Sequence, residues 1–310
     1  MDNFNQKIKK YKIPHIDYKN IRWKNNIDSG ATGDVYNGIL QDETSIIIKI
    51  YRLDDYYNEN HFYEDALDEL YNYSLVKGFF HCCELYGYSY SVEDDSKEIY
   101  LVMKDYKVIG NIYKYLSDYK YWTTFEKREI DSNEYLYIYD GIYNYYNLDR
   151  QQKIKITYAI CDAIKELHDH NIVHCDLKLL NMLYDSKENL VKLIDFGVSC
   201  NLKSETYSYI DEDMGTMGYM SFELYNGCVY KRSDIYSLGV LLIELWVGDI
   251  WKNGETFEEC YNEVLESLKI LKEKEPQLVK ILKPCLSDKV EKRPYIKTLI
   301  RRLHKIFTEE

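Results

Sequence analysis

H-C-D-L-K-L-L-N, at residues 174–181, is the stretch that decides the predicted fold of this chain, and D-F-G follows it at residues 195–197. Together these segments place two carboxylates, an ammonium and a carboxamide in two short loops. Each loop lies next to an apolar run typical of a strand, at residues 182–184 and 190–194. The sequence therefore predicts a polar site carried by two loops beside short strands.

These four groups are the set that transfer of a phosphoryl group from a magnesium nucleotide needs. A carboxylate receives the proton of the incoming hydroxyl, and a cation offsets the charge of the transferring phosphate. An aspartate and an asparagine supply the oxygen ligands that Mg²⁺ prefers. Finding all four types in two neighbouring loops predicts phosphoryl transfer.

The two segments resemble the catalytic loop H-R-D-x-K-x-x-N and the metal loop D-F-G of the eukaryotic-type serine/threonine protein kinases. The resemblance implies ATP and Mg²⁺ as cofactors, with Asp176 accepting the hydroxyl proton and Lys178 neutralising the transferring phosphoryl group. It also implies that Asn181 and Asp195 bind the metal. Cys175 replaces the Arg that grips a phosphorylated activation loop in the family. We therefore expect activity that does not depend on phosphorylation of that loop.

A glycine-bearing turn near the N-terminus extends the resemblance. Gly30 and Gly33 match the second and third glycines of the kinase loop G-x-G-x-x-G-x-V, where backbone N–H groups approach phosphate oxygens, and Asp28 replaces the first. Taken alone, the segment is a weak signal and is more typical of an ordinary β-turn. The nucleotide-binding loop that the resemblance implies consists of Ile27, Asp28, Ser29, Gly30, Ala31, Thr32, Gly33, Asp34 and Val35.

Lys49 lies in an apolar, β-branched run at residues 46–50. A lone lysine in such a strand is more often an edge or snorkelling residue. Its distance from the glycine loop, however, resembles that of the V-A-I-K lysine, which clamps the α- and β-phosphates and pairs with a glutamate of the next helix. An apolar stripe predicts that helix at residues 59–76. Glu69 is the favoured partner and Glu64 is the rival.

Further segments match the family along almost the whole chain. Met103 is expected to guard the back of the adenine pocket, with the Lys104 carbonyl and the Tyr106 amide as hydrogen-bond partners of the adenine. Residues 215–223 resemble G-T-x-x-Y-M-[AS]-P-E, with Phe222 in place of Pro. Two more implied contacts lie downstream, where Asp234 caps the catalytic loop and Arg293 pairs with Glu223.

The sequence pattern changes at about residue 150, from short β-branched runs to long helical stripes. In the first hundred residues we expect strands and turns with one helix. The prediction is an α+β, bilobal protein-kinase-like fold, with a small β-rich N-lobe and a larger helical C-lobe. Its boundaries are an N-terminal extension at 1–20 and a kinase domain at 21–307, divided into N-lobe 21–103, hinge 104–106 and C-lobe 107–307, with a Tyr-rich insert at about 117–147.

Several activities fit these motifs. Lys178 and Thr216 are typical of serine/threonine kinases, so phosphorylation of protein Ser and Thr hydroxyls is the first hypothesis. A non-catalytic pseudokinase scaffold is the alternative, motivated by Asp28, Cys175 and Phe222. A small-molecule kinase is a third and weaker option, because such enzymes typically lack a segment like 215–223.

Composition narrows the partners and the location. A formal net charge of −12 argues against binding to nucleic acid or to acidic membranes and favours basic protein substrates. The eight cysteines form no C-x-x-C pair, and the chain has neither an apolar signal core nor a membrane-spanning run, so we expect reduced thiols in a soluble, cytoplasmic protein. The 34 tyrosines indicate an AT-rich genome and would suit a large DNA virus of protists, in the host cytoplasm or the virion. The oligomeric state stays open.

Overall fold

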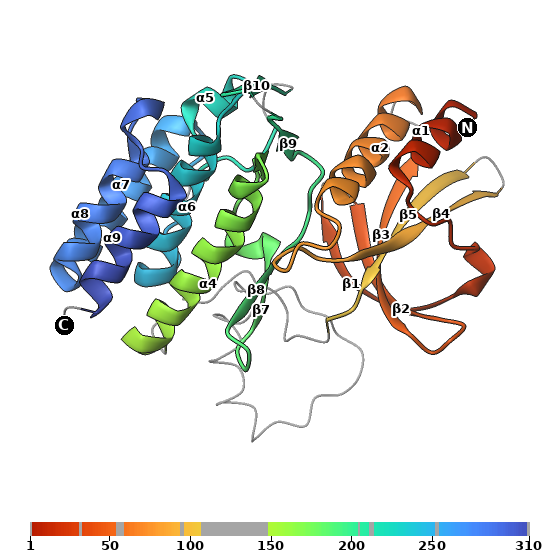
Figure 1. Cartoon of the computed structure of the whole chain (residues 1–310), viewed down its shortest axis with the longest axis horizontal. Coiled ribbons are helices and arrows are strands. Elements are labelled where there is room, and N and C mark those ends of the chain that lie inside the picture. The colour runs from red at the N-terminus through yellow and green to blue at the C-terminus, as the bar shows by residue number, and fades with distance from the viewer. Residues whose placement is uncertain are drawn as a thin grey trace. The chain divides into compact units, whose positions relative to one another are not determined.

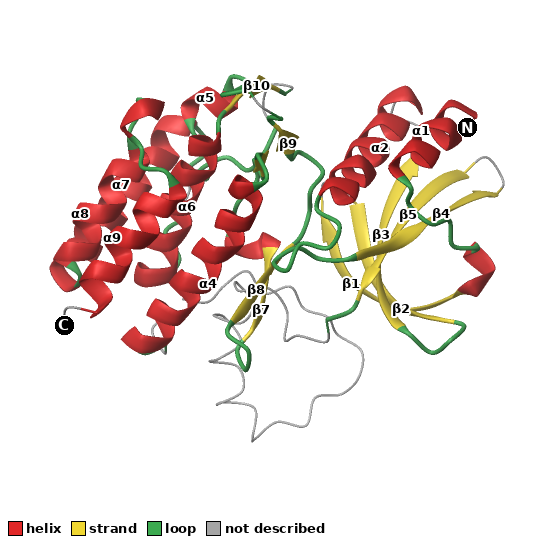
Figure 2. Cartoon of the chain, in the orientation of Figure 1, coloured by secondary structure: helices red, strands yellow, loops and turns green. Residues whose placement is uncertain are grey.

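The computed structural model describes residues 2–30, 33–53, 59–93, 96–106, 148–203, 205–210, 214–251 and 254–308. The chain divides into two units, one formed by Met1–Val108 with Lys192–Asn201, and the other by Ile109–Val191 with Leu202–Glu310 (Figure 1). The Tyr-rich insert expected at 117–147 lies outside the described residues. The α+β class and the strand-rich and helix-rich halves are as predicted (Figure 2).

The first unit is built on a five-stranded antiparallel sheet in the order β1-β2-β3-β5-β4. In β3, Ile46, Ile48 and Ile50 alternate along the strand and are buried in one apolar core, because successive side chains of a strand point to opposite faces. Lys49 therefore points to the other face. The strands are β1 (Ile21–Gly30), β2 (Gly33–Leu40), β3 (Ser45–Leu53), β4 (Leu85–Glu93) and β5 (Ser96–Lys104).

The first unit also contains two α-helices, α1 (Asp2–Tyr11) and α2 (Glu59–Leu75), and the short 3₁₀ helix η1 (Tyr18–Asn20). The expectation of one helix in the first hundred residues was wrong, because α1 was missed. The signal was a short stripe in a mostly polar segment, in which Tyr11 completes the i, i+4, i+7 spacing of two apolar residues, Phe4 and Ile8. Both are buried, and the Phe4 ring lies 5.4 Å from that of Tyr63 on α2, so packing against α2 stabilises α1.

Residues 192–201 belong to the first unit, although the sequence placed them in the C-lobe. The Leu193 N–H donates to the His81 carbonyl at 2.7 Å, and the Leu193 carbonyl accepts from the Cys83 N–H at 2.9 Å. These backbone hydrogen bonds attach the D-F-G segment to the connection between α2 and β4. The predicted boundary between the lobes followed chain order, so it did not include the return of residues 192–201 to the first unit.

The second unit is helical, and its central helix α6 (Lys231–Val247) is buried at every residue from 233 to 246. This helix packs against α4, α7 and α8 and ends at Gly248, whose φ of +115° favours glycine. The described parts of the chain include no helix of sufficient length and apolarity to cross a membrane. The other α-helices are α4 (Arg150–Asp169), α5 (Phe222–Tyr225), α7 (Phe257–Lys274), α8 (Pro276–Leu282) and α9 (Ile296–Thr308).

Short strands and 3₁₀ turns connect these helices. β7 and β8 follow the catalytic loop as predicted from the two apolar runs, and β10 pairs with β11. The short strands are β6 (Ile172–Val173), β7 (Met182–Asp185), β8 (Leu190–Leu193), β9 (Cys200–Asn201), β10 (Ser208–Tyr209) and β11 (Cys228–Val229). The 3₁₀ turns are η4 (Leu179–Asn181), η5 (Lys283–Leu286) and η6 (Val290–Lys292).

Candidate active site

A buried cation lies on the face of the first unit's sheet opposite to the isoleucine core. The side chain of Lys49 is nearly inaccessible, and its Nζ lies 2.7 Å from Glu69 Oε2 and 3.0 Å from Asp195 Oδ1. Glu69 comes from α2 and is fully buried, whereas Glu64 is exposed on the same helix. The glutamate that pairs with Lys49 is therefore Glu69.

Burial and charge oppose each other in this cluster. Burial by itself lowers the pKa of the Lys49 ammonium, but the charges of Glu69 and Asp195 outweigh it and leave that pKa raised. Burial also raises the pKa of Glu69, an effect that Lys49 opposes and Asp195 reinforces. Two carboxylates share one ammonium, so the fully ionised cluster carries one excess negative charge and suits a neighbouring cation.

Tyr51 is a member of this cluster that sequence reasoning missed. It lies two residues after Lys49 on the same face of β3, its hydroxyl donates to Glu69 Oε2, and Lys49 Nζ lies 5.3 Å from its ring centroid. Burial, followed by the charge of Glu69, raises the pKa of Tyr51 well above its ordinary value, so the hydroxyl stays protonated and donates. The signal was present in the sequence, in the period-two spacing of the two residues.

Helix α2 also holds the segment that carries Asp195. The Asn72 amide donates to the carbonyls of Phe196 and Ser199 at 2.8 and 2.9 Å, and the Phe196 ring lies 5.1 Å from that of Tyr73. These contacts fix a backbone in which Asp195 has a φ of +63°, an uncommon conformation for an aspartate. The position of its carboxylate therefore depends on α2.

In the second unit, Asp176 is oriented on both carboxylate oxygens. Its Oδ1 accepts from the Thr216 hydroxyl at 2.6 Å, and its Oδ2 accepts from Asn181 Nδ2 at 2.8 Å. Lys178 Nζ lies 2.9 Å from the same Oδ2 and also donates to Thr216 Oγ1 at 2.6 Å. The structure thus brings the three predicted catalytic residues and Thr216 into one hydrogen-bonded cluster.

The fully buried carboxylate of Asp234 caps the loop that carries this cluster. Its oxygens accept from the backbone N–H groups of His174 and Cys175, both at 3.0 Å, and His168 Nε2 lies 2.9 Å from Oδ2. Cys175 has a φ of +68°, so the chain turns sharply one residue before Asp176. The cap holds this turn from α6.

A bidentate ion pair joins Glu223, at the start of α5, to Arg293. The two N–O distances are 2.5 and 2.9 Å, and Arg293 is only 1% exposed. Burial alone raises the pKa of Glu223, but Arg293 outweighs it and leaves that pKa below the ordinary value. Arg293 also donates to the carbonyls of Ser287 and Arg232. The pair ties the segment before α5 to the region before α9.

The predicted nucleotide-binding loop is only partly described. Ala31 and Thr32 lie outside the described residues, as do the side chains of Asp28 and Ser29. Gly33 has a φ of +119°, and a Cβ there would lie 2.3 Å from the Ile50 carbonyl oxygen, so this position requires glycine. Asp34 forms an ion pair with Arg52, and Ile27 is exposed. In β1 and β2, Asp28 is the backbone partner of Val35.

The two residues predicted to bind adenine lie at the end of β5. The Lys104 N–H donates to the Glu84 carbonyl at 2.9 Å, and the Tyr106 hydroxyl accepts from the Glu84 N–H at 3.1 Å. Met103 precedes them, is buried, and accepts a hydrogen bond from the Tyr73 hydroxyl through its Sδ at 3.3 Å. These bonds fix the strand end against the connection between α2 and β4.

The family model of the protein kinase domain matches residues 21–304. The chain belongs to the protein kinase domain family. It is 26% identical over 306 residues to wall-associated receptor kinase-like 18 of Arabidopsis thaliana, covering 90% of this chain and 34% of that protein. It is 34% identical over 159 residues to serine/threonine-protein kinase MPS1 of Encephalitozoon cuniculi, a match that covers 47% of this chain and 25% of that protein. It is also 37% identical over 110 residues to serine/threonine-protein kinase PrkC of Bacillus subtilis, a match that covers 35% of this chain and 17% of that protein. The chain therefore spans about a third or less of the length of these relatives.

Two departures from the family motifs have a clear place in this kinase domain. Cys175 is buried, and its thiol donates to the Val173 carbonyl at 3.7 Å. A small, uncharged side chain therefore fills the position of the family's Arg. Phe222 is 61% exposed, and its ring lies 5.9 Å from that of Phe257. Neither substitution removes a hydrogen bond from the Asp176 cluster.

Replacing Arg293 by Ala should lower the free energy of unfolding by about 3–5 kcal/mol, because the Glu223 carboxylate, whose side chain is only 14% exposed, would lose its partner. Urea unfolding followed by circular dichroism measures the loss. Arg301→Ala, at an exposed position on α9, is the control and should change the value by no more than about 0.5 kcal/mol. Equal midpoints for the two variants would contradict the stabilising role of the pair.

The same pair predicts a pH dependence. Because the folded pKa of Glu223 lies below its ordinary value of 4.5, the stabilisation is fully present above that pH and is lost as the pH falls through the folded pKa. The difference between wild type and Arg293→Ala should therefore shrink in acid.

Proposed function

We propose that this chain is a serine/threonine protein kinase that transfers the γ-phosphoryl group of ATP to protein hydroxyls. The observation that carries the proposal is the Asp176 carboxylate, which Thr216 and Asn181 hold on both oxygens beside the Lys178 ammonium. Such a fixed carboxylate suits the acceptance of a hydroxyl proton, and the adjacent cation suits the charge of a transferring phosphoryl group.

The other residues suit the binding of ATP with Mg²⁺. Asn181 uses Nδ2 for its bonds to Asp176, which leaves an amide oxygen of the type that Mg²⁺ prefers. Asp195 belongs to a cluster with excess negative charge. We assign the metal to these two residues and the phosphates to Lys49. When bound, Mg²⁺ supplies charge neutralisation at the phosphates.

Two observations support the choice of substrate. Lys178 and Thr216, the two residues typical of serine/threonine kinases, are hydrogen-bonded to each other, and Thr216 also donates to Asp176. The net charge of −12 favours substrates with basic residues around the acceptor hydroxyl. The names of the relatives from E. cuniculi and B. subtilis also include serine/threonine specificity, at low identity.

A pseudokinase scaffold is the second candidate function. The substitutions Asp28, Cys175 and Phe222 favour it, because each changes a family motif. Against it, the Lys49–Glu69–Asp195 cluster is assembled, and Asp176, Lys178 and Asn181 lie together in one hydrogen-bonded cluster, as phosphoryl transfer needs. The enzyme is therefore the better-supported function.

The proposal predicts that Asp176→Asn lowers the transfer of radiolabelled γ-phosphate to a generic basic protein by about 10²–10⁴-fold, since the proton acceptor is lost. Asp195→Ala should abolish the transfer. Asp162→Asn, at an exposed position on α4, is the matched control and should keep full activity. Equal transfer by wild type and Asp195→Ala would refute the enzyme hypothesis in favour of the scaffold.

Activity should not depend on phosphorylation of the segment between Asp195 and Glu223. Cys175 provides no guanidinium to bind a phosphate there, so treatment with a phosphatase should leave the rate unchanged. Mass spectrometry of Thr206 and Ser208 verifies that the phosphate was removed. A large loss of activity, restored by incubation with ATP, would show that this expectation is wrong.

Tyr51→Phe tests the third member of the lysine cluster. The substitution removes the hydroxyl that donates to Glu69, and a hydrogen bond to a charged group is worth about 1.5–3 kcal/mol. We therefore expect kcat/KM for ATP to fall by roughly tenfold or more. Tyr90→Phe, on β4 of the same sheet, is the control for loss of a hydroxyl alone. An unchanged kcat/KM in Tyr51→Phe would exclude a positioning role.

A further inference from the structure

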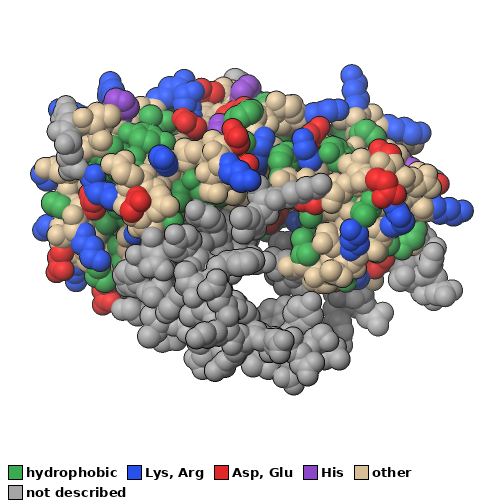
Figure 3. Space-filling view, turned by 90° about the horizontal axis from the view of Figure 1, so that it is seen from below, with side chains coloured by type: hydrophobic (Ala, Val, Ile, Leu, Met, Phe, Trp, Pro, Cys, Tyr) green, Lys and Arg blue, Asp and Glu red, His purple; other side chains and the backbone are tan. Residues whose placement is uncertain are grey.

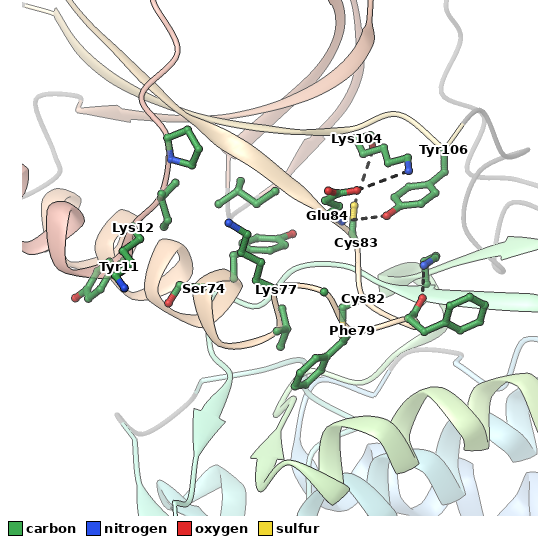
Figure 4. Close-up of a pocket in the computed structure, with 18 residues that line it drawn as sticks. Tyr11, Lys12, Ser74, Lys77, Phe79, Cys82, Cys83, Glu84, Lys104 and Tyr106 are labelled. Atoms are coloured by element: carbon green, nitrogen blue, oxygen red, sulfur yellow. Dashed lines mark hydrogen bonds and ion pairs between the residues drawn. The ribbon is translucent and has the colours of Figure 1, made fainter.

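The first unit contains a cavity of about 270 Å³ that none of the residues of the lysine cluster lines (Figure 4). Its walls come from the chain after α1, the C-terminal end of α2, the connection from α2 to β4, and the end of β5. The residues that line it include Lys12, Tyr73, Lys77, Glu84, Lys104 and Tyr106, together with Phe80 and Lys192. The volume lies just below the usual range for small-molecule sites, so the cavity suits a small ligand.

The cavity is basic although the whole chain is acidic. Among the described residues that line it are the lysines Lys12, Lys77, Lys104 and Lys192 and a single acidic residue, Glu84. The formal charge of the lining is thus +4 − 1 = +3, against −12 for the chain. An anion would therefore find here a local positive charge in a chain whose net charge is negative.

Two of these lysines are held against aromatic rings. Lys192 Nζ donates to the Phe80 carbonyl and lies 4.9 Å from the Phe80 ring centroid and 5.2 Å from that of Tyr106. Lys104 Nζ lies 5.2 Å from the Tyr106 ring centroid and 3.6 Å from Glu84. The wall therefore presents cations and ring faces together.

The other two lysines are exposed. Within the described ranges, neither Lys12 nor Lys77 forms an ion pair or a side-chain hydrogen bond, so their charge is not compensated by a neighbouring carboxylate. They come from different elements, the chain after α1 and the end of α2, and both line the same cavity. An anionic ligand would gain from both.

The cavity also touches the residues that hold the candidate active site. Tyr73 lines it, while its ring lies 5.1 Å from that of Phe196 and its hydroxyl donates to Met103. Lys77 follows the end of α2, the helix that carries Glu69. A ligand here would contact the helix that positions the lysine cluster without touching the cluster itself.

We propose that this cavity binds a small organic anion, a phosphate or carboxylate group carried on an aromatic ring. The anionic group interacts with Lys12 and Lys77 at the exposed side, and the ring packs among the aromatic side chains. The cavity shares Lys104 and Tyr106 with the predicted ATP site, but the predicted adenine contacts use their backbone carbonyl and amide, whereas the ligand proposed here would meet their side chains. The existence of this site does not rest on the proposed catalytic activity.

Isothermal titration of the full chain with phenyl phosphate tests the proposal. We expect one molecule to bind, inorganic phosphate and benzyl alcohol to bind more weakly because each lacks one half of the ligand, and saturating Mg-ATP to leave the binding in place. Lys12→Glu combined with Lys77→Glu should weaken binding by about tenfold or more.

The matched control is Lys9→Glu with Lys10→Glu, which makes the same change in net charge at exposed positions of α1 outside the cavity lining. This variant should bind phenyl phosphate as wild type does, and unchanged thermal unfolding shows that both variants fold. The proposal is overturned by absence of binding, by equal loss in the two double variants, or by displacement with Mg-ATP.

Discussion

The buried ammonium of Lys49 is the constraint on which the first unit depends. A cation taken out of water without a partner costs several kcal/mol, and β3 itself provides no carboxylate on that face. Glu69 must therefore come from α2, and Asp195 from a segment nearly 150 residues away in sequence. Because Asn72 and Tyr73 hold the backbone and ring of that segment, one helix positions both carboxylates.

In the second unit, the buried carboxylate of Asp234 and the partly buried carboxylate of Glu223 are likewise paired with donors from other segments. Asp234 receives two backbone N–H groups and the ring of His168, and Glu223 receives a guanidinium. In each case the carboxylate and its donors come from distant parts of the chain, so satisfying the charge also places an element of the site. Asp234 places the turn before Asp176, and Glu223 places the segment that contains Thr216.

The departures from the kinase motifs lie outside these polar contacts. Cys175 has a φ of +68° and donates its backbone N–H to Asp234 while its side chain is buried, and Phe222 lies exposed beside Phe257. Tyr51, by contrast, takes part in the polar contacts, because its hydroxyl donates a hydrogen bond to Glu69 of the lysine cluster. At Cys175 the chain has thus lost the arginine of the family motif, while it retains the charged groups of the Asp176 and Lys49 clusters.

The sequence by itself determined the residue types of the site, the long helices, and the face of β3 on which Lys49 lies. Motif spacing and the periods of strand and helix carry that information locally. It left Glu64 and Glu69 as alternatives, and it missed α1, the return of residues 192–201 and the role of Tyr51. Only the tertiary structure decided these features, because each depends on a contact between elements far apart in the chain: α1 on the face of α2, Leu193 on the chain before β4, and the basic cavity on four separate segments. Local periodicity fixes which face a side chain occupies, whereas burial and the pairing of charges fix what it meets there.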